Sequence, residues 1–349
     1  PKKAFGIEAV REAAGTAALY LQKLGVTSAS TILHGAGAGK MDPAAVAEAM
    51  AEASILACYR FDTYKTNDKP KRPLKKLTIV EFDRGRLTGV RRGARSGRQI
   101  ADATCLARDL PNLPGNTATP AYLARTARSI ARSHGLSCQV FDETRMRRLG
   151  MGALLAVSQG SAQKAQFIIL EYNKRAGGKP LVFVGKGVTF DSGGVSIKPG
   201  GGMEDMKFDM CGAAAVLGAM QAVAALKLPG RIIGVVPATE NLLDGQGYKP
   251  GDILTTLSGK TIEIVNTDAE GRLILADALA YTTRFKPAAV IDLATLTGAC
   301  VVALGHHATG MMGNDDKLAE KVKRAGEATG ERVWPLPLWD DYRKQIRSD

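Results

Sequence analysis

Uninterrupted apolar runs separated by helix-like segments most constrain the fold of this chain. The runs are LVFVGKG at 181–187, RIIGVVPA at 231–238 and AAVIDLATL at 288–296. They are apolar throughout and do not alternate with polar residues, which is typical of strands buried on both faces. Segments with helical spacing of apolar residues separate them, at 212–226 and 272–285. This alternation predicts an α/β domain with a mainly parallel central sheet covered by helices.

The N-terminal part of the chain shows the same alternation on a smaller scale. Apolar residues at helical spacing predict a helix over 7–24, and a second helix begins at Pro43, a residue suited to the first turn. TILHG at 31–35 and LTIVEF at 77–82 are predicted to be short strands. These elements indicate a small, partial N-terminal α/β domain.

A boundary between the two parts is predicted near residue 110. PNLPGNTATP, which begins at Pro111, is dense in residues that interrupt regular structure, and it follows an Arg-rich stretch and a helix. We therefore expect a partial N-terminal domain at 1–86, a linking helix at 87–110 and a catalytic domain at 111–349. A helix at 120–134 and a hairpin-like pair between Leu254 and Val265 belong to the last of these.

Composition and the chain ends bear on the cellular setting. The five cysteines form no CxxC pair, which favours reduced thiols over a disulfide framework. No charged-then-apolar leader opens the chain, and no apolar run reaches the roughly 18 residues that span a bilayer. We expect a soluble, cytoplasmic protein. The chain starts at Pro1 without an initiator Met and stops at Asp349 within a charged run, so we expect a piece of a longer protein whose C-terminal part is missing.

A glycine-rich loop after the run at 181–187 carries the first candidate functional residues. It reads GKGVTFDSGGVSIKPGGGMEDMKFDMCG and contains Lys186, Asp191, Lys198 and Asp209. Glycines at these densities let the backbone adopt conformations that side chains forbid, as loops wrapped around a ligand require.

A second segment, NTDAEGRL, carries Asp268, Glu270 and Arg272. We expect it to be extended, so that a period of two directs all three side chains to one side. Both segments follow predicted parallel strands, where open α/β sheets bind ligands. Any one of these residues alone is best read as a solvated loop charge, but the whole set among so many glycines favours a site. More than three carboxylates together indicate more than one hard or borderline metal ion.

Four blocks within these segments resemble the leucyl (cytosol) aminopeptidase family. They are VGKGVTFDSGG, SIKP, MKFDM and NTDAEGR, which occur in the family's order and spacing. The resemblance covers the chain from about residue 110 onward and, more loosely, the part before it. It implies a metallo-aminopeptidase that hydrolyses the N-terminal residue, preferably leucine or another apolar one, from peptides with a free N-terminus.

The resemblance also implies a role for each candidate residue. Two divalent metal ions, Mn²⁺ or Zn²⁺, would activate a water and be held by Lys186, Asp191, Asp209, Asp268 and Glu270. Lys198 and Arg272 would act in catalysis, with Arg272 holding a bicarbonate as general base. The pocket for the substrate's first side chain would be bordered by Met206, Thr295, Leu296 and Gly298. Since a lysine ligates a metal only as the neutral amine, Lys186 needs a lowered pKa, which a neighbouring dication supplies. The family also implies a homo-hexamer.

A basic stretch supports an alternative function. The chain has 47 basic and 34 acidic residues, a formal charge of +13, and the stretch at 84–98 contributes Arg84, Arg86, Arg91, Arg92, Arg95 and Arg98. A solvated or subunit-facing surface is the simpler interpretation, and DNA binding by a member of the same fold is the alternative.

Other catalytic classes lack their motifs. No HExxH or GxSxG occurs, which argues against the common zinc proteases and serine hydrolases. His306 and His307 follow VVALG, which we expect to be a strand, and we assign them structural or subunit-contact roles.

Overall fold

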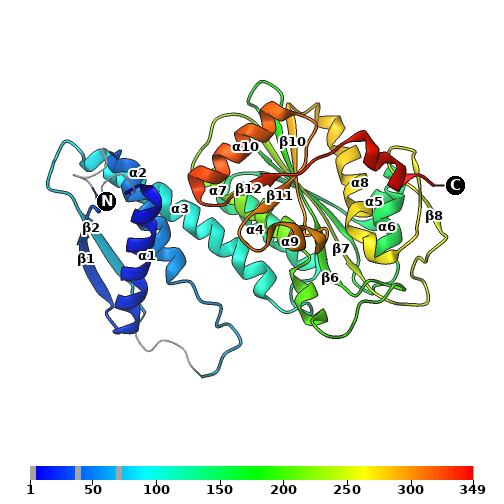
Figure 1. The fold of residues 1–349 in the computed structure, drawn as a ribbon, viewed down its shortest axis with the longest axis horizontal. Coiled ribbons are helices and arrows are strands. Elements are labelled where there is room, and N and C mark those ends of the chain that lie inside the picture. Colours follow the sequence, from blue (N-terminus) through cyan, green and yellow to red (C-terminus); the bar gives the residue numbers. More distant parts are fainter. Residues whose placement is uncertain (1–4, 36–40, 68–72, 349) are drawn as a thin grey trace.

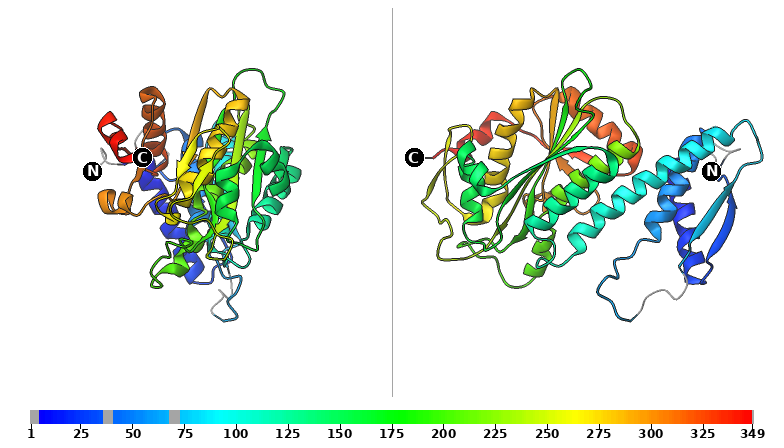
Figure 2. Two further views of the ribbon diagram at one scale, coloured as in Figure 1. Left: turned by 90° about the vertical axis from the view of Figure 1, so that its right-hand side faces the viewer. Right: turned by 180° about the vertical axis from the view of Figure 1, so that it is seen from behind.

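The computed structural model of the chain describes residues 5–35, 41–67 and 73–348. It confirms the α/β class: a small N-terminal unit and a larger unit with a central sheet are joined by one long helix (Figures 1 and 2). The domain boundaries at 86 and 110 stay a prediction.

The N-terminal unit packs two helices against a two-stranded sheet. Helices α1 (Ile7–Lys23) and α2 (Pro43–Ala57) begin where the sequence predicts, and the Asp42 side chain caps α2 by accepting from the Ala44 and Ala45 amides. Strands β1 (Ser28–Ile32) and β2 (Lys76–Val80) pair in parallel. The strand expected at 31–35 therefore lies earlier, because its first residues are small and polar at a half-exposed sheet and give no apolar signal.

Helix α3 (Leu87–Asn112) connects the two units and contains four arginines of the Arg-rich stretch, with Arg84 and Arg86 just before it. It packs closely on α2 through glycines. A Cβ added at Gly93 would lie 1.9 Å from the Ala44 carbonyl oxygen, and one at Gly97 would lie 2.1 Å from the Glu48 carbonyl oxygen. The glycines thus form the packed face of α3, and all six arginines of the stretch are exposed.

The central sheet has six strands in the order β10-β5-β7-β4-β3, with β6 also paired to β7. Within it β4 runs antiparallel to both neighbours, whereas the other pairs are parallel, as a mainly parallel sheet requires. The sequence analysis made no prediction for residues 137–172, which contain β3, β4 and two helices between them. The strands are β3 (Ser137–Phe141), β4 (Gln166–Tyr172), β5 (Leu181–Gly185), β6 (Gly187–Asp191), β7 (Ile232–Asn241) and β10 (Ala289–Leu293).

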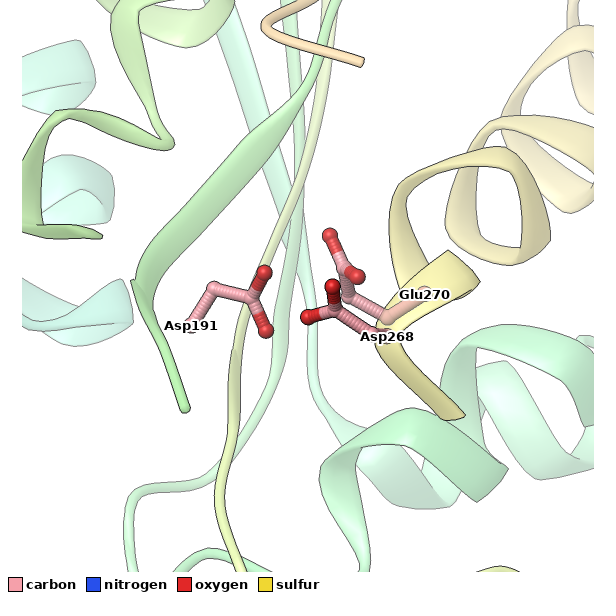
Figure 3. A group of neighbouring side chains, drawn as sticks. All are labelled: Asp191, Asp268 and Glu270. Carbon is pink, nitrogen blue, oxygen red and sulfur yellow. The ribbon is translucent and has the colours of Figure 1, made fainter. Parts of the chain in front are cut away.

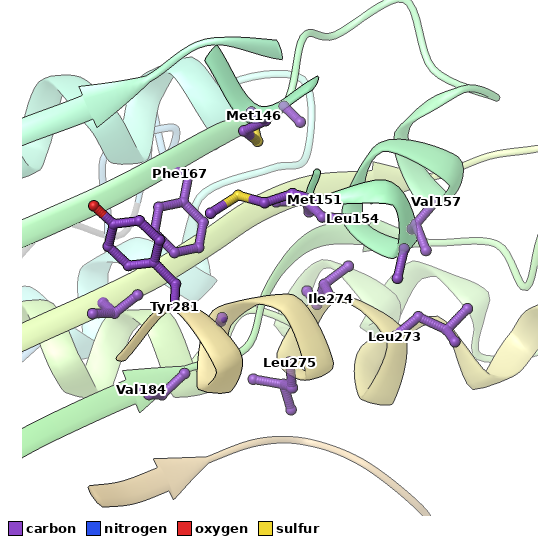
Figure 4. Packing of buried hydrophobic residues seen from close by; sticks show 14 of the residues in the cluster. Met146, Met151, Leu154, Val157, Phe167, Val184, Leu273, Ile274, Leu275 and Tyr281 are labelled. Atoms are coloured by element: carbon purple, nitrogen blue, oxygen red, sulfur yellow. The ribbon is translucent and has the colours of Figure 1, made fainter. Parts of the chain in front are cut away.

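Helices cover both faces of this sheet and enclose two hydrophobic cores. One core lies under α5, α6 and α8 and includes Phe167 and Ile169; the other lies under α4, α7 and the end of α3 and includes Ile168 and Leu170 (Figure 4 shows the first). Successive residues of β4 therefore point into opposite cores. These helices are α4 (Pro120–His134), α5 (Glu143–Leu149), α6 (Gly152–Ser158), α7 (Cys211–Ala225) and α8 (Glu270–Thr282).

Helix α7 bears on the expectation that no apolar run could span a bilayer. The stretch Met203–Ala225 has a mean hydropathy of 1.5 and is long enough to pass a test of length and composition, contrary to that expectation. However, 61% of its most apolar part is buried, and α7 packs against α3, β5 and β7. It is a helix of the protein core.

The predicted hairpin is present between β7 and α8 as β8 (Ile253–Thr255) and β9 (Thr261–Glu263).

The last part of the described chain follows the edge strand β10. The strand expected at VVALG is wrong: these residues lie in helix α9 and the glycine that ends it, because apolar residues in so short a run fit either structure. The remaining elements are α9 (Ala299–Leu304), β11 (Thr309–Met311), α10 (Asp316–Thr329) and β12 (Val333–Pro335).

Candidate metal centre

Lys186 separates β5 from β6 and lies at the carboxyl end of the sheet. Its amide donates to the Leu293 carbonyl (2.9 Å), and its own carbonyl accepts from the Ala213 amide at the start of α7 (2.8 Å). The backbone is thus fixed from β10 on one side and α7 on the other. Only 3% of the residue is exposed, so its ammonium group needs partners within the protein.

The Lys186 Nζ atom has three such partners. It lies 2.8 Å from Asp209 Oδ1 and 2.7 Å from Glu270 Oε1, and it donates to the Thr295 carbonyl at 2.7 Å. The lysine side chain passes across the start of α8, where a Cβ at Gly271 would lie 2.6 Å from Lys186 Cε. Gly271 therefore leaves the space that Lys186 occupies.

A second lysine joins the other two carboxylates. Lys198 Nζ lies 3.0 Å from Asp191 Oδ2 and 2.5 Å from Asp268 Oδ1. Asp191, Asp268 and Glu270 each direct one carboxylate oxygen to within 4.8 Å of the others, and Figure 3 shows the three groups facing one another. The glycine-rich loop and NTDAEGR, distant in the sequence, therefore meet at one point.

The NTDAEGR segment is not extended, as the sequence analysis expected. Residues Thr267–Ala269 form a 3₁₀ turn whose start is held by the Asn266 side chain, which accepts from the Asp268 amide (2.8 Å), and α8 begins at Glu270. Asp268 and Glu270 still face the same point because the turn precedes the helix directly. Arg272 lies in the first turn of α8, is exposed, and has no hydrogen bond or ion pair with any residue that the structure describes.

The buried groups of the centre are short of positive charge. Four carboxylates, those of Asp191, Asp209, Asp268 and Glu270, face only two ammonium groups, those of Lys186 and Lys198. Burial raises the pKa of Asp209 to about 8, with Lys186 opposing the rise and Glu270 adding to it. Burial likewise raises the pKa of Glu270, which Lys186 opposes.

The pKa of Lys186 is raised as well. Burial acts to lower the pKa of Lys186, but attraction by Asp209 and Glu270 outweighs it and raises the pKa above its ordinary value. The chain's own charged groups thus raise the pKa of Lys186, whereas a neighbouring dication would lower it. Since Asp209, Glu270 and Lys186 all have raised pKa values, this part of the cluster favours added positive charge.

The carboxylates also have oxygens that fit a cation. Asp209 Oδ2 is buried and accepts no hydrogen bond from the described residues, whereas Asp268 Oδ1 and Glu270 Oε1 are buried and each lies against a lysine ammonium group. Buried carboxylate oxygens of this kind are costly unless a cation or donor reaches them. The donor set suits hard or borderline divalent ions.

The residues expected at the substrate pocket lie at different distances from these groups. Thr295 contacts the cluster directly: its Oγ1 donates to Asp209 Oδ1 (2.8 Å) and its carbonyl accepts from Lys186. Met206, half-buried, accepts at its carbonyl from the Asp209 amide (3.3 Å). Leu296 and Gly298 lie in the same exposed segment as Thr295, between β10 and α9.

The sequence analysis missed residues that support the clustered carboxylates. Asn241, the last residue of β7, donates from Nδ2 to Asp191 Oδ1 (2.8 Å), and Tyr248 donates to the Thr267 carbonyl (2.6 Å) beside Asp268. Glu240 and Asn241 are two polar residues at the end of a wholly buried strand. Because buried polar side chains need hydrogen-bond partners, this pattern could have identified Asn241.

Comparison with known proteins identifies similar chains. The family model described as "Cytosol aminopeptidase family, catalytic domain" matches residues 105–349, and that of the same family's N-terminal domain matches residues 1–68. A protein of Geotalea uraniireducens named "Probable cytosol aminopeptidase" is 53% identical over 344 residues, which are 97% of this chain and 68% of that protein. A protein of the same name from Syntrophotalea carbinolica is 52% identical, over 98% of this chain and 69% of its own length.

A solved structure agrees with these matches. It is described as "Bottromycin maturation enzyme BotP in complex with Mn" and superposes with a TM-score of 0.90 at 38% sequence identity, covering 99% of this chain and 73% of that one.

Proposed function

The chain belongs to the cytosol aminopeptidase family, and on that premise we propose that it is a two-metal enzyme which removes the N-terminal residue, preferably leucine or another apolar one, from peptides. Membership makes it a hydrolase acting on peptides. The observation that carries the finer proposal is the meeting of four carboxylates and two lysines in one largely buried cluster, in which Asp209 Oδ2 has no hydrogen-bond donor among the described residues.

The proposed ligands of two divalent ions are Lys186, Asp191, Asp209, Asp268 and Glu270. The ions would supply Lewis-acid polarisation of the scissile carbonyl and activation of the attacking water. Lys186 must then act as a neutral amine, so it gives up the proton that Asp209 and Glu270 favour here. Mn²⁺ and Zn²⁺ both suit this donor set, and the BotP structure is described with Mn.

Lys198 and Arg272 are proposed to act on the substrate. Lys198 pairs with Asp191 and Asp268 here. With bound dications neutralising those carboxylates, its ammonium group would be free to donate to the oxyanion on the scissile carbonyl. Arg272, exposed and without a partner among the described residues, can hold an anion, which we take to be the bicarbonate that serves as general base.

Substrate selection would follow from the groups beside the cluster. Asp209 would help to bind the free α-amino group, which explains restriction to peptides with a free N-terminus. The substrate's first side chain would lie against Met206, Thr295, Leu296 and Gly298. A homo-hexameric assembly and a cytoplasmic location belong to the same proposal.

A direct experiment tests the assignment. The chain, supplied with Mn²⁺ or Zn²⁺, is incubated with a leucyl anilide and with the same anilide acetylated on its amine, with and without a chelator. We expect turnover of the free-amine substrate alone and its loss on chelation. Equal cleavage of the acetylated compound would exclude an aminopeptidase.

The exposed arginines favour one secondary function, DNA binding. Only Arg86 and Arg98 of the six have ion-pair partners among the described residues, Asp83 (3.1 Å) and Asp102 (3.6 Å), so most of the charge on this surface of α3 and the loop before it is unneutralised. Binding of duplex DNA that weakens steeply with salt, and is lost when these arginines are replaced by glutamine, would support it. Unchanged binding in the glutamine variant would exclude this surface.

A further inference from the structure

Asn241 occupies a buried position between the two segments that carry the proposed ligands. It ends β7, is 0% exposed, and is paired in the sheet with Asp191 of β6. Its backbone carbonyl accepts from both the amide and the hydroxyl of Ser192, each at 2.9 Å. The backbone that leads from Asp191 into the glycine-rich loop is therefore held to the end of β7.

The side chain of Asn241 makes the more informative contacts. Its Nδ2 donates to Asp191 Oδ1 at 2.8 Å and to the Thr267 carbonyl at 3.1 Å. A carbonyl oxygen cannot donate, and the ionised carboxylate that a metal requires cannot either, so only the amide nitrogen can face this pair. This orientation leaves Asn241 Oδ1 buried without a hydrogen-bond donor among the described residues, an unfavourable state that the fold tolerates here.

The contacts decide which oxygen of Asp191 remains for a cation. Oδ1 accepts from Asn241 Nδ2 and from the Gly193 amide (2.9 Å). With Oδ1 held by two donors, Oδ2 is the oxygen that faces Lys198 and Asp268. Rotation of the carboxylate would break both hydrogen bonds.

The same amide also sets the position of the second ligand segment. Thr267, whose carbonyl accepts from Asn241, directly precedes Asp268, and its hydroxyl donates to the Gly193 carbonyl at 2.6 Å. One amide group thus bonds both to a proposed ligand, Asp191, and to the residue preceding another, Asp268.

We propose that Asn241 is a positioning residue of the metal centre, which fixes the carboxylate of Asp191 and its spacing from Asp268 so that both can bind the same ion. This inference rests on the proposed function, because it requires these carboxylates to be metal ligands. Hydrogen-bonded partners of ligands typically contribute 10–100-fold to metal affinity.

The neighbouring residue provides a matched control. Glu240 also ends β7 and is 7% exposed, but its carboxylate accepts from the Ser161 hydroxyl (2.5 Å), away from the ligands, because successive side chains of a strand point to opposite faces. Replacing it by glutamine perturbs the same strand end without touching Asp191.

The experiment measures Mn²⁺ binding directly, by the electron paramagnetic resonance signal of the free ion, in the parent 349-residue chain and in the variants Asn241→Leu, Asn241→Asp and Glu240→Gln. We expect affinity to fall about 10–100-fold in both Asn241 variants and to stay unchanged in Glu240→Gln. Asn241→Asp keeps the shape of the side chain and adds a negative charge, which by itself would attract a cation. Weaker Mn²⁺ binding in this variant would therefore reflect loss of the Nδ2 donor. If Asn241→Leu does not fold, Asn241→Asp alone tests the inference. Circular dichroism of the metal-free proteins should match the parent.

Two results would overturn the inference alone: parental affinity in the Asn241 variants, or an equal loss in Glu240→Gln. Failure of the parent chain to bind Mn²⁺ would overturn both this inference and the proposed two-metal function. The two failures are therefore distinguishable.

Discussion

Lys198 Nζ lies 2.5 Å from Asp268 Oδ1, so a residue proposed to act in catalysis is paired with a residue proposed to bind metal. Burial acts to lower the pKa of Lys198, but the hydrogen bonds from its ammonium group to Asp268 and Asp191 outweigh it and raise the pKa. The ammonium group thus supplies part of the positive charge that dications would supply. A dication bound as proposed would compete with Lys198 for the same carboxylates.

This competition predicts that Lys198 is dispensable for metal binding. Lys198→Ala and Arg272→Ala should keep full metal content, because removing a cation lowers the electrostatic cost of a nearby dication. Turnover should fall by about 10²–10³ in kcat with a much smaller change in KM. Metal analysis and steady-state kinetics on the same preparations decide it. Loss of metal together with activity in Lys198→Ala would place this residue among the ligands.

The carboxylates should behave in the opposite way. Asp268→Asn and Glu270→Gln keep size but remove charge that offsets a dication, so metal and activity should disappear together. Asp205→Asn is the control, since this exposed residue of the glycine-rich loop forms no ion pair with the cluster among the described residues. Two equivalents of metal retained by either ligand variant, measured by elemental analysis, would show that the replaced residue is not a ligand.

The close packing of α2 and α3 predicts a stability difference between two glycines of one helix. A Cβ at Gly97 would overlap the Glu48 carbonyl, so Gly97→Ala should destabilise the N-terminal unit by about 1–3 kcal/mol. A Cβ at Gly89 would lie 3.8 Å from Ala44 Cβ, an ordinary contact, so Gly89→Ala should be neutral or stabilise by up to about 1 kcal/mol. Urea unfolding of both variants tests this, and equal stability would contradict the packing.

A buried carboxylate in α8 predicts a second stability effect. Asp277, 0% exposed, accepts from the Leu154 amide (2.9 Å) and the Leu257 amide (2.7 Å), which ties α8 to α6 and to the hairpin. Asparagine offers only one acceptor oxygen, so Asp277→Asn should cost about 1–3 kcal/mol of unfolding free energy. Asp341→Asn, at an exposed position, is the control. Thermal unfolding in which both variants match the parent would contradict the role of Asp277.

Local signals made much of this fold predictable. The helices at 7–23, 43–57 and 120–134 have apolar spacing and recognisable ends, such as Thr119 accepting from the Tyr122 amide and Gly135 in the left-handed conformation. The direction of β4 was not predictable, because its central residues form an apolar run, which has the same pattern in a parallel and in an antiparallel pair.

The candidate site, like the fold, was predictable only in part. The ligand types and their clustering followed from two motif segments, but the assumed extended form of NTDAEGR was wrong, because a turn capped by Asn266 leads directly into α8. Asn241 was missed since its role depends on the pairing of β6 with β7, which no local pattern reveals.

The space at Gly271 has an evolutionary consequence. Any side chain there would overlap Lys186, with the added Cβ only 2.7 Å from Nζ, so a change at one position alters the other. Two motif segments far apart in the sequence therefore constrain each other's substitutions at this contact. We expect lineages that vary at Gly271 to have changed Lys186 as well, and covariation across homologues would reveal the pair as coupled positions.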